Sequence, residues 1–201
     1  AVAQNDVRVS YCAIEEHDSD VALFLKKISD PDCETAILIG IDDPRIHEVA
    51  ADIGKPCVLI NSRDRNMRLD MVMPDHQLIG EFSANYLIEH GHRDILTLMC
   101  LRRKTMETRL NGIREAWADH NMIFDDSRHL VATSGFGATE TREAISTYFS
   151  TCSTESRPTA ILAGGDFMAV GAQEALEKLG LSVPGDISIM SMDGFNLAEI
   201  H

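Results

Sequence analysis

Segments with strand-like and helix-like patterns of apolar residues alternate along the chain. In 7–12 the apolar residues recur at every second position, as in a strand, and in 18–28 they recur at helical spacing. The short run 36–40 is apolar throughout, as in a strand covered on both faces. Strands are predicted at 7–12, 36–40, 57–60, 71–73, 95–99, 129–132, 160–163 and 187–190. Helices are predicted at 18–28, 44–51, 75–90, 105–120, 138–150 and 167–179. Such alternation predicts an α/β fold with parallel strands and helices on both faces, and leaves open one large sheet or two smaller ones.

The composition narrows the possible classes of protein. The chain has 201 residues, 44% of them hydrophobic, with 18 Lys and Arg against 32 Asp and Glu, so its formal charge is −14. No apolar run approaches the roughly 20 residues that cross a membrane, so we expect no membrane partner. Nucleic-acid affinity depends mainly on cations that neutralise phosphates. This chain is therefore not expected to hold DNA by itself.

The cysteines and the chain ends suggest the cellular setting. Five cysteines without a CxxC pair do not resemble a secreted disulfide framework, so we expect free thiols in the cytoplasm, most of them small core residues. Residues 1–6 contain neither an initiator Met nor a signal peptide, and 197–201 stop without a closing element. We expect a piece of a longer polypeptide.

Sequence motifs of enzymes are missing. The chain has no GxSxG, HExxH or GxxxxGK[ST] motif. Gly135-Phe136-Gly137 lacks the third glycine of a dinucleotide fingerprint, and His90 and His92 flank a predicted helix end, where a cation suits the helix dipole. We therefore expect a protein that is not an enzyme and that holds no cofactor and no metal.

Several residues with binding chemistry lie just beyond predicted strands. Asp75, Phe136, Asp166 and Asp193 each follow a strand, in the region where open α/β sheets bind ligands. With the donors of Arg109, these carboxylates and the aromatic wall suit a sugar or nucleoside, which has polar edges and an apolar face. The spacing alone also fits helix caps at Asp75 and Asp166 and a surface ion pair at Arg109.

Several longer motifs resemble those of a known protein family. They are MPDHQLIG at 73–80, YLIEHGHRDI at 86–95, RLNGIREA at 109–116, PTAILAGGDFMAVGA at 158–172 and GLSVPGDISIMSMDGF at 180–195. In order and spacing, over nearly the whole chain, these motifs resemble the LacI/GalR family of bacterial transcription regulators.

The resemblance implies a domain organisation. It implies a periplasmic-binding-protein-like effector domain of type I, with two parallel-sheet α/β subdomains and a ligand cleft between them. The expected division is an N-terminal subdomain at 1–98, a C-terminal subdomain at 99–192, and the start of a crossover segment at 193–201. The family's first strand and helix, its final segments and its basic helix-turn-helix headpiece have no counterpart here, so the domain is expected to be truncated at both ends.

The resemblance also implies roles for residues. Arg109 matches an arginine that grips effector hydroxyls or a carboxylate, Asp193 an aspartate that binds sugar hydroxyls, and Phe136 an aromatic cleft wall. Asp75 matches a polar contact from the first subdomain, and Thr105 is a weaker candidate. The chain departs from the family at Gly165, where an asparagine is usual.

A basic run at 102–104 is a second departure from the family. It fits either a solvated group of charges or, through Arg103, part of a site for an anionic effector such as a sugar phosphate or sugar acid.

Two functions follow. In the first, the chain senses a sugar, sugar acid, sugar phosphate or nucleoside in a cytoplasmic homodimer, and controls operator DNA through the missing headpiece. In the second, it is a periplasmic or lipoprotein sugar-binding protein of a transport system. The cysteines weigh against the second.

Overall fold

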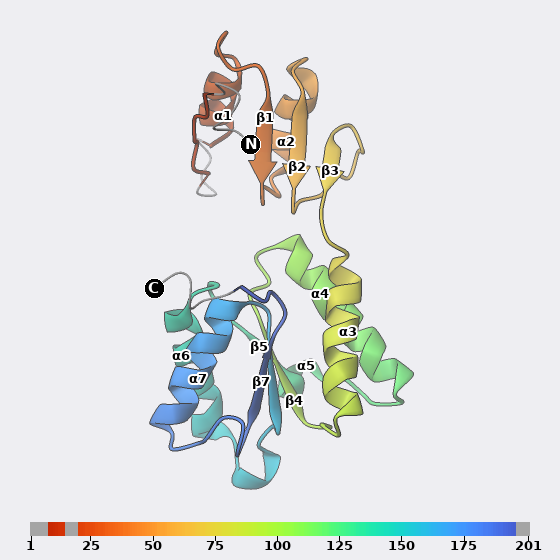
Figure 1. The fold of residues 1–201 in the computed structure, drawn as a ribbon, viewed down its shortest axis with the longest axis vertical. Helices are drawn as coiled ribbons and strands as arrows, with labels where there is room; N and C mark the ends of the chain where they lie inside the picture. The colour runs from red at the N-terminus through yellow and green to blue at the C-terminus, as the bar shows by residue number, and fades with distance from the viewer. Residues whose placement is uncertain (1–7, 15–19, 196–201) are drawn as a thin grey trace. The chain divides into compact units, whose positions relative to one another are not determined.

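The chain divides into two compact units between Pro74 and Asp75. A computed structural model describes residues 8–14 and 20–195, with unit 1 running to Pro74 and unit 2 beginning at Asp75 (Figure 1). Sequence analysis placed the division at residue 98. The structure divides the chain earlier because the helix at 76–89 packs closely against the helix at 104–119, within unit 2.

Unit 1 is built on a three-stranded parallel sheet. Its elements are α1 (Asp20–Ile28), β1 (Ala36–Ile39), α2 (Pro44–Asp52), β2 (Cys57–Ile60) and β3 (Asp70–Val72), with strand order β1-β2-β3. The α2 helix begins where predicted, because the Asp43 carboxylate accepts from the Arg45 backbone N–H at 2.8 Å and proline occupies the first turn.

The two faces of this sheet differ. Apolar residues of α1 and α2 pack on one face around Leu38 and Leu59. On the other face Ile37, Ile39 and Val72 are each more than 60% exposed, and Ile39, Ile60 and Val72 are register partners. Unit 1 therefore presents, in the part of the chain described, a sheet face that is mostly apolar, with Asp70 of β3 as a charged member.

The predicted strand at 7–12 does not form within the described residues. Residues 8–12 are irregular, and Val7 lies outside the described part. A strand needs a neighbour for its backbone hydrogen bonds, and in the described sheet β1 pairs only with β2, so residues 8–12 do not pair with its outer edge. The alternating pattern alone therefore did not make a strand.

Unit 2 holds a four-stranded parallel sheet with order β5-β4-β6-β7. Its helices are α3 (His76–Glu89), α4 (Lys104–Asp119), α5 (Asp126–His129), α6 (Ala138–Thr151) and α7 (Asp166–Lys178), with a 3-10 turn at Thr154–Ser156. Its strands are β4 (Ile95–Met99), β5 (Leu130–Ala132), β6 (Ala160–Ala163) and β7 (Ser188–Ser191). The α5 helix and the 3-10 turn, both very short, were not predicted, and His129 ends α5 instead of opening a strand.

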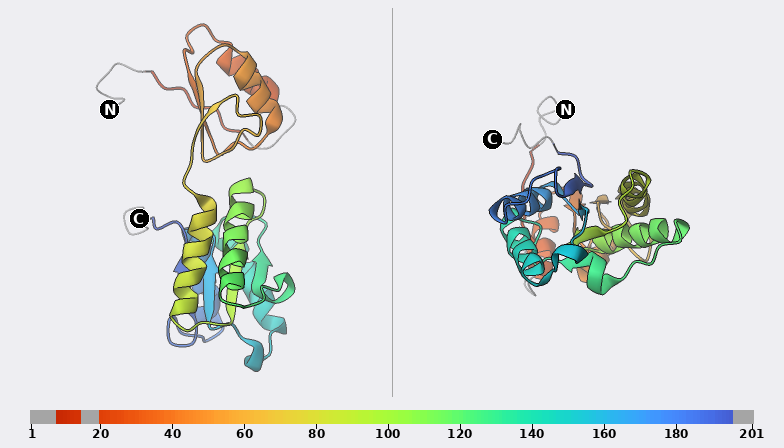
Figure 2. Two further views of the ribbon diagram at one scale, coloured as in Figure 1. Left: turned by 90° about the vertical axis from the view of Figure 1, so that its right-hand side faces the viewer. Right: turned by 90° about the horizontal axis from the view of Figure 1, so that it is seen from below.

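Helices cover both faces of the unit 2 sheet. In Figures 1 and 2, α3 and α4 lie on one face and α6 and α7 on the other, and every residue of β4 and β6 is buried. One core gathers around Trp117 and Met99, the other around Ile145 and Ile161. The α/β class with two parallel sheets is confirmed.

Two glycines set the approach of α3 to α4. A Cβ at Gly80 would lie 1.9 Å from the Arg109 carbonyl oxygen, and one at Gly112 would lie 2.0 Å from the Gln77 carbonyl oxygen. The backbones are thus in contact where the helices cross. This crossing fixes the position of Arg109, which lies on α4 beside Gly80.

The structure also tests the expectations about the cysteines and about membrane-spanning helices. All five cysteines are free thiols, but only Cys57 and Cys100 are buried, so the expectation that most are core residues is wrong. Within 8–14 and 20–195, no helix has the length and apolar character needed to cross a membrane.

Candidate functional site

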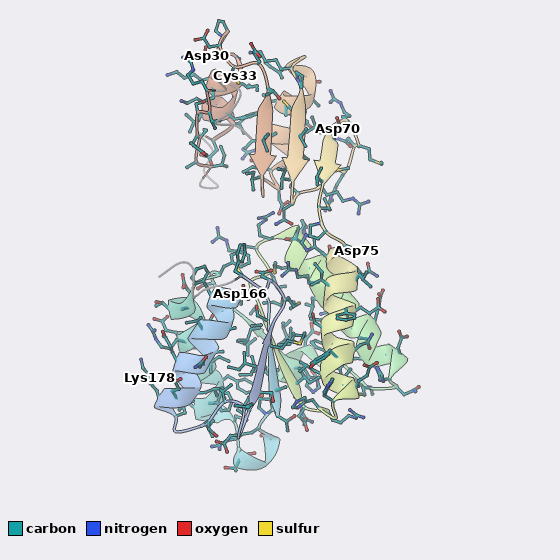
Figure 3. All side chains as sticks on the ribbon, viewed as in Figure 1. Asp30, Cys33, Asp70, Asp75, Asp166 and Lys178 are labelled. Carbon is teal, nitrogen blue, oxygen red and sulfur yellow. The ribbon has the colours of Figure 1, made fainter. Side chains whose placement is uncertain are left out.

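The carboxyl ends of the unit 2 strands gather polar side chains at one edge of the sheet. In a parallel sheet all strands end at the same edge, so the loops after β4, β6 and β7 meet there. Figure 3 shows Asp75 at the start of α3 and Asp166 at the start of α7, both at this edge. We call it the polar edge of unit 2.

Arg109 is the buried centre of the polar edge. It is only 5% exposed, and its Nη1 donates to the Gly164 carbonyl oxygen at 2.9 Å and to Asp193 Oδ1 at 2.8 Å. Its Nε donates to His76 Nδ1 at 3.2 Å. The alternative of a surface ion pair is wrong, because the side chain is sequestered from water.

One donor group of this arginine is left over. Arg109 makes all its described hydrogen bonds through Nε and Nη1, so in the described part of the chain Nη2 has no hydrogen-bond partner. A guanidinium that is held on one side and open on the other presents fixed donors to an oxygen-rich ligand.

Asp193 lies on a loop that Asp166 holds. The Asp166 carboxylate is 7% exposed and accepts from the Ser191 hydroxyl, from the Gly194 backbone N–H at 3.2 Å and from the Phe195 backbone N–H. Asp166 is therefore not a simple helix cap: it ties the start of α7 to the loop after β7. Asp193 itself is about 30% exposed at the side chain.

Asp193 packs closely against Gly165. A Cβ at Gly165 would lie 2.9 Å from Asp193 Oδ2, the carboxylate oxygen that does not bind Arg109. The resembled family usually has asparagine at this position, and a side chain there would require Asp193 or the backbone to move.

His76 is a member of the polar edge that sequence analysis missed. It is 4% exposed, and burial lowers the pKa of its imidazole, with the Arg109 and Arg103 guanidinium groups lowering it further while Asp193 and Asp75 oppose them. Its sequence position beside Asp75 was visible, but nothing in the spacing paired it with an arginine 33 residues away.

The other predicted residues are placed as follows. Asp75 is exposed and caps α3, accepting from the Leu78 backbone N–H at 3.0 Å; it opens unit 2, so its assignment to the first subdomain is corrected. Thr105 is 6% exposed with an Oγ1 that has no described partner. Phe136 is 39% exposed in the turn before α6, and Arg103 is half-buried at the start of α4.

The side chains of the polar edge have the chemistry of a binding site for a small polar ligand. It combines guanidinium donors, a partly exposed carboxylate and a buried hydroxyl, which match the hydroxyls or carboxylate of a small polar ligand. Within 8–14 and 20–195, no cluster of three or more His, Cys, Asp or Glu side chains is placed to hold a metal ion.

Comparison with known proteins gives the family. The model of the periplasmic binding protein-like domain matches residues 84–200, more than half of the chain. The chain belongs to this family, as a LacI/GalR-type effector-binding domain.

Curated relatives are repressors. The chain is 30% identical to the HTH-type transcriptional repressor PurR of Vibrio campbellii, over 72% of this chain and 42% of that protein. It is 27% identical to the ribose operon repressor of Haemophilus influenzae, over 81% of this chain and 48% of that protein. The chain thus spans less than half the length of either relative.

Solved structures share the fold. A LacI family transcriptional regulator from Mycobacterium smegmatis superposes with a TM-score of 0.83 at 24% identity, over all of this chain and 73% of that one. A sugar-binding LacI family regulator from Escherichia coli, complexed with phosphate, superposes with a TM-score of 0.75 at 22% identity, over 92% of this chain and 66% of that one.

Proposed function

We propose that this chain is the ligand-sensing part of a LacI-type transcriptional regulator. A small sugar-like effector binds at the polar edge of unit 2, and its binding changes how a helix-turn-helix headpiece, outside this chain, engages operator DNA. The regulator acts as a homodimer, and neither a metal nor a cofactor takes part.

The Arg109–Asp193 ion pair is the observation that carries this proposal. An ion pair with one buried partner is weak evidence for a stabilising role, because desolvation offsets its attraction. Its placement at the strand ends, with Nη2 and Asp193 Oδ2 available, instead favours a ligand site. The effector's hydroxyls accept from Nη2 and donate to Oδ2, while Phe136 supplies an apolar wall.

The effector belongs to the class of sugars, sugar acids, sugar phosphates and nucleosides. The name of the Haemophilus influenzae relative, a ribose operon repressor, makes D-ribose the first neutral candidate. Since the relatives named are transcriptional repressors, a regulator is favoured over a transport protein or an enzyme.

A thermal-shift screen tests the proposal. D-Ribose, D-ribose 5-phosphate, D-gluconate and inosine are added to the wild-type chain and to Asp193→Asn. We expect at least one of them to raise the melting temperature of the wild type, and the rise to disappear in the variant, which cannot accept two hydroxyl donors. An equal rise in both proteins contradicts the site.

The basic run at 102–104 supports a narrower version of the proposal. Arg103 is close enough to His76 to lower the pKa of that imidazole, so its charge acts at the polar edge. If Arg103 faces the effector, titration calorimetry gives tighter binding of D-gluconate than of D-ribose, and Arg103→Ala removes the preference. Equal affinities of the wild type for the two ligands contradict an anionic effector.

A further inference from the structure

We infer that His76 is a positioning residue for effector binding: its ring holds the Nε side of the Arg109 guanidinium in place, and protonation of the ring releases it. The inference rests on the proposed function, since the guanidinium it orients is the proposed effector donor. It assigns to His76 both a geometric role and a pH dependence of effector affinity.

The Arg109 guanidinium is held at two of its nitrogens. The bonds to the Gly164 carbonyl and to Asp193 Oδ1 both start from Nη1, whose N–H bonds lie in the plane of the group. The bond from Nε to His76 Nδ1, at 3.2 Å, holds the group at a second nitrogen, so that it stays in this plane and position. That plane determines where the two N–H bonds of Nη2 point.

The contact also fixes the state of the ring. Arg109 Nε always carries a proton, so His76 Nδ1 must accept. The ring is then the neutral tautomer with its proton on Nε2. A protonated ring would direct an N–H at the Nε–H of a buried guanidinium, so the contact cannot survive protonation.

Among the described residues, four charged groups act on His76. They are Arg109 on α4, Arg103 at the N-cap of α4, Asp75 at the N-cap of α3, and Asp193 in the loop after β7. Burial and the two arginines lower the pKa of His76, and the two carboxylates raise it. The net lowering keeps the ring neutral at pH 7 and above, where it accepts from Arg109, and moves its protonation to more acidic pH.

An asparagine substitution separates this role from simple packing. His76→Asn retains an acceptor oxygen on a short side chain but does not titrate, whereas His76→Leu fills much of the space with neither acceptor nor charge. His129 provides the matched control, because it is also a buried histidine of unit 2 with a pKa lowered by burial, yet it lies against Trp117 and Phe124.

The first test needs no ligand. NMR titrations of the full chain follow the His76 ring and the Arg109 Nε–H. We expect the Nε–H signal of Arg109 to shift with the same midpoint as the ring. We also expect the His76 midpoint to rise toward 6.5 in Arg109→Gln while the His129 midpoint stays unchanged. A His76 midpoint that ignores Arg109→Gln overturns the inference.

The second test measures affinity by calorimetry between pH 5.5 and 8. The ligand is D-ribose or D-gluconate, whichever the screen selects, because neither titrates in this range. Wild type and His129→Asn are expected to bind more weakly at pH 5.5 than at pH 8, by up to about 10-fold, the full loss of one hydrogen bond, because the lowered pKa leaves the ring only partly protonated at pH 5.5. His76→Asn is expected to bind within about 3-fold of wild type at pH 8 and to lose the pH dependence, and His76→Leu to bind roughly 10-fold more weakly at both pH values.

The outcomes separate this inference from the proposed function. Unchanged pH dependence in His76→Asn, or wild-type affinity in His76→Leu at pH 8, overturns the role of His76 while the effector site stands. Binding that survives Asp193→Asn overturns the proposed site, and the ligand-free titrations then still decide whether His76 holds Arg109.

Discussion

At the scale of single residues, the polar edge depends on a carboxylate that does not itself face the ligand side. Asp166 accepts from the Ser191 hydroxyl and from the backbone of Gly194 and Phe195, and so sets the loop that carries Asp193. Hydrogen bonds to a charged acceptor are stronger than neutral ones. The position of Asp193 is therefore coupled to Asp166.

Asp166→Asn is predicted to lower the free energy of unfolding by about 1–3 kcal/mol, as measured by urea denaturation. The amide loses the charge and turns a donor toward the backbone N–H groups of the loop. Effector affinity is expected to fall as well, since the loop carries Asp193.

Asp186→Asn is the matched control for that substitution. Asp186 accepts from the backbone and hydroxyl of Ser182 in the turn before β7, away from the polar edge. Asp186→Asn is expected to lower the free energy of unfolding without changing effector affinity. If Asp166→Asn alters neither quantity, the proposed dependence of Asp193 on Asp166 is wrong.

Single residues of the site could be predicted from the sequence where they carry a local signal. Asp193, Arg109 and Phe136 were selected because they follow strands or match a family motif. The hydrogen-bond partners of Arg109 were not predictable. His76, Gly164 and Asp193 are 33, 55 and 84 residues away in sequence, and they meet Arg109 only when unit 2 folds. The sequence left Asp166 as either a ligand-side carboxylate or a helix cap, and its contacts with the loop after β7 were not predictable for the same reason.

At the scale of elements, the crossing of α3 and α4 holds the site. Alanine at an ordinary helical glycine position stabilises a protein by up to about 1 kcal/mol. At Gly112, where a Cβ would lie 2.0 Å from the Gln77 carbonyl oxygen, the sign is reversed. Gly112→Ala is predicted to lower the free energy of unfolding by roughly 1–3 kcal/mol, measured by denaturant titration.

Gly171→Ala separates loss of stability from disturbance of the site. A Cβ at Gly171 would lie 2.3 Å from the Ala138 carbonyl oxygen, on the opposite face of the sheet. Both alanines are expected to destabilise unit 2, but Gly112→Ala, by moving α4, is expected to weaken effector binding more. Stabilisation by Gly112→Ala contradicts the close crossing.

Most elements were predictable from local pattern, and the exceptions depend on neighbours. The strands at 57–60, 95–99 and 160–163 match prediction because their residues, apart from Thr97, are apolar and each run ends at a polar or glycine-containing turn. The segment 8–12 has a strand pattern but does not pair with any strand in the described part of the chain. Pattern reports the preference of a segment, whereas a sheet also requires the adjacent strand.

At the scale of the whole molecule, the buried histidines of unit 2 make the free energy of unfolding depend on pH. His76, His92 and His129, all in unit 2, have pKa values lowered by burial. Below about pH 6.5 the unfolded chain takes up protons that the folded unit does not. The free energy of unfolding is therefore predicted to fall as the pH drops from 7.5 to 5.5.

Urea denaturation at several pH values checks this prediction, with His129→Gln as the variant. Removal of one lowered-pKa histidine is expected to reduce the slope of stability against pH in this window. A flat dependence, or greater stability at pH 5.5, contradicts the assignment of neutral buried rings.

Unit 1 is predicted to expose a surface that binds hydrophobic probes. Ile37, Ile39 and Val72 are 63%, 68% and 63% exposed on one sheet face. Contiguous apolar patches of this kind promote association and dye binding.

Ile39→Thr is expected to reduce 8-anilinonaphthalene-1-sulfonate fluorescence. Ile123→Thr, at a single exposed site in unit 2, is expected to leave the fluorescence unchanged. Equal fluorescence for the wild type and Ile39→Thr contradicts the patch.

Titration calorimetry of the effector from the screen tests the central claim, that Arg109 and Asp193 form the binding site. The comparison is between the wild type, Arg109→Lys and Arg114→Lys; Arg114 also lies on α4 and pairs with an aspartate, but at the surface. Lysine cannot reproduce the fixed fork of donors, so we predict that Arg109→Lys weakens binding at least about 10-fold while Arg114→Lys binds as the wild type does. Wild-type affinity in Arg109→Lys would contradict the account.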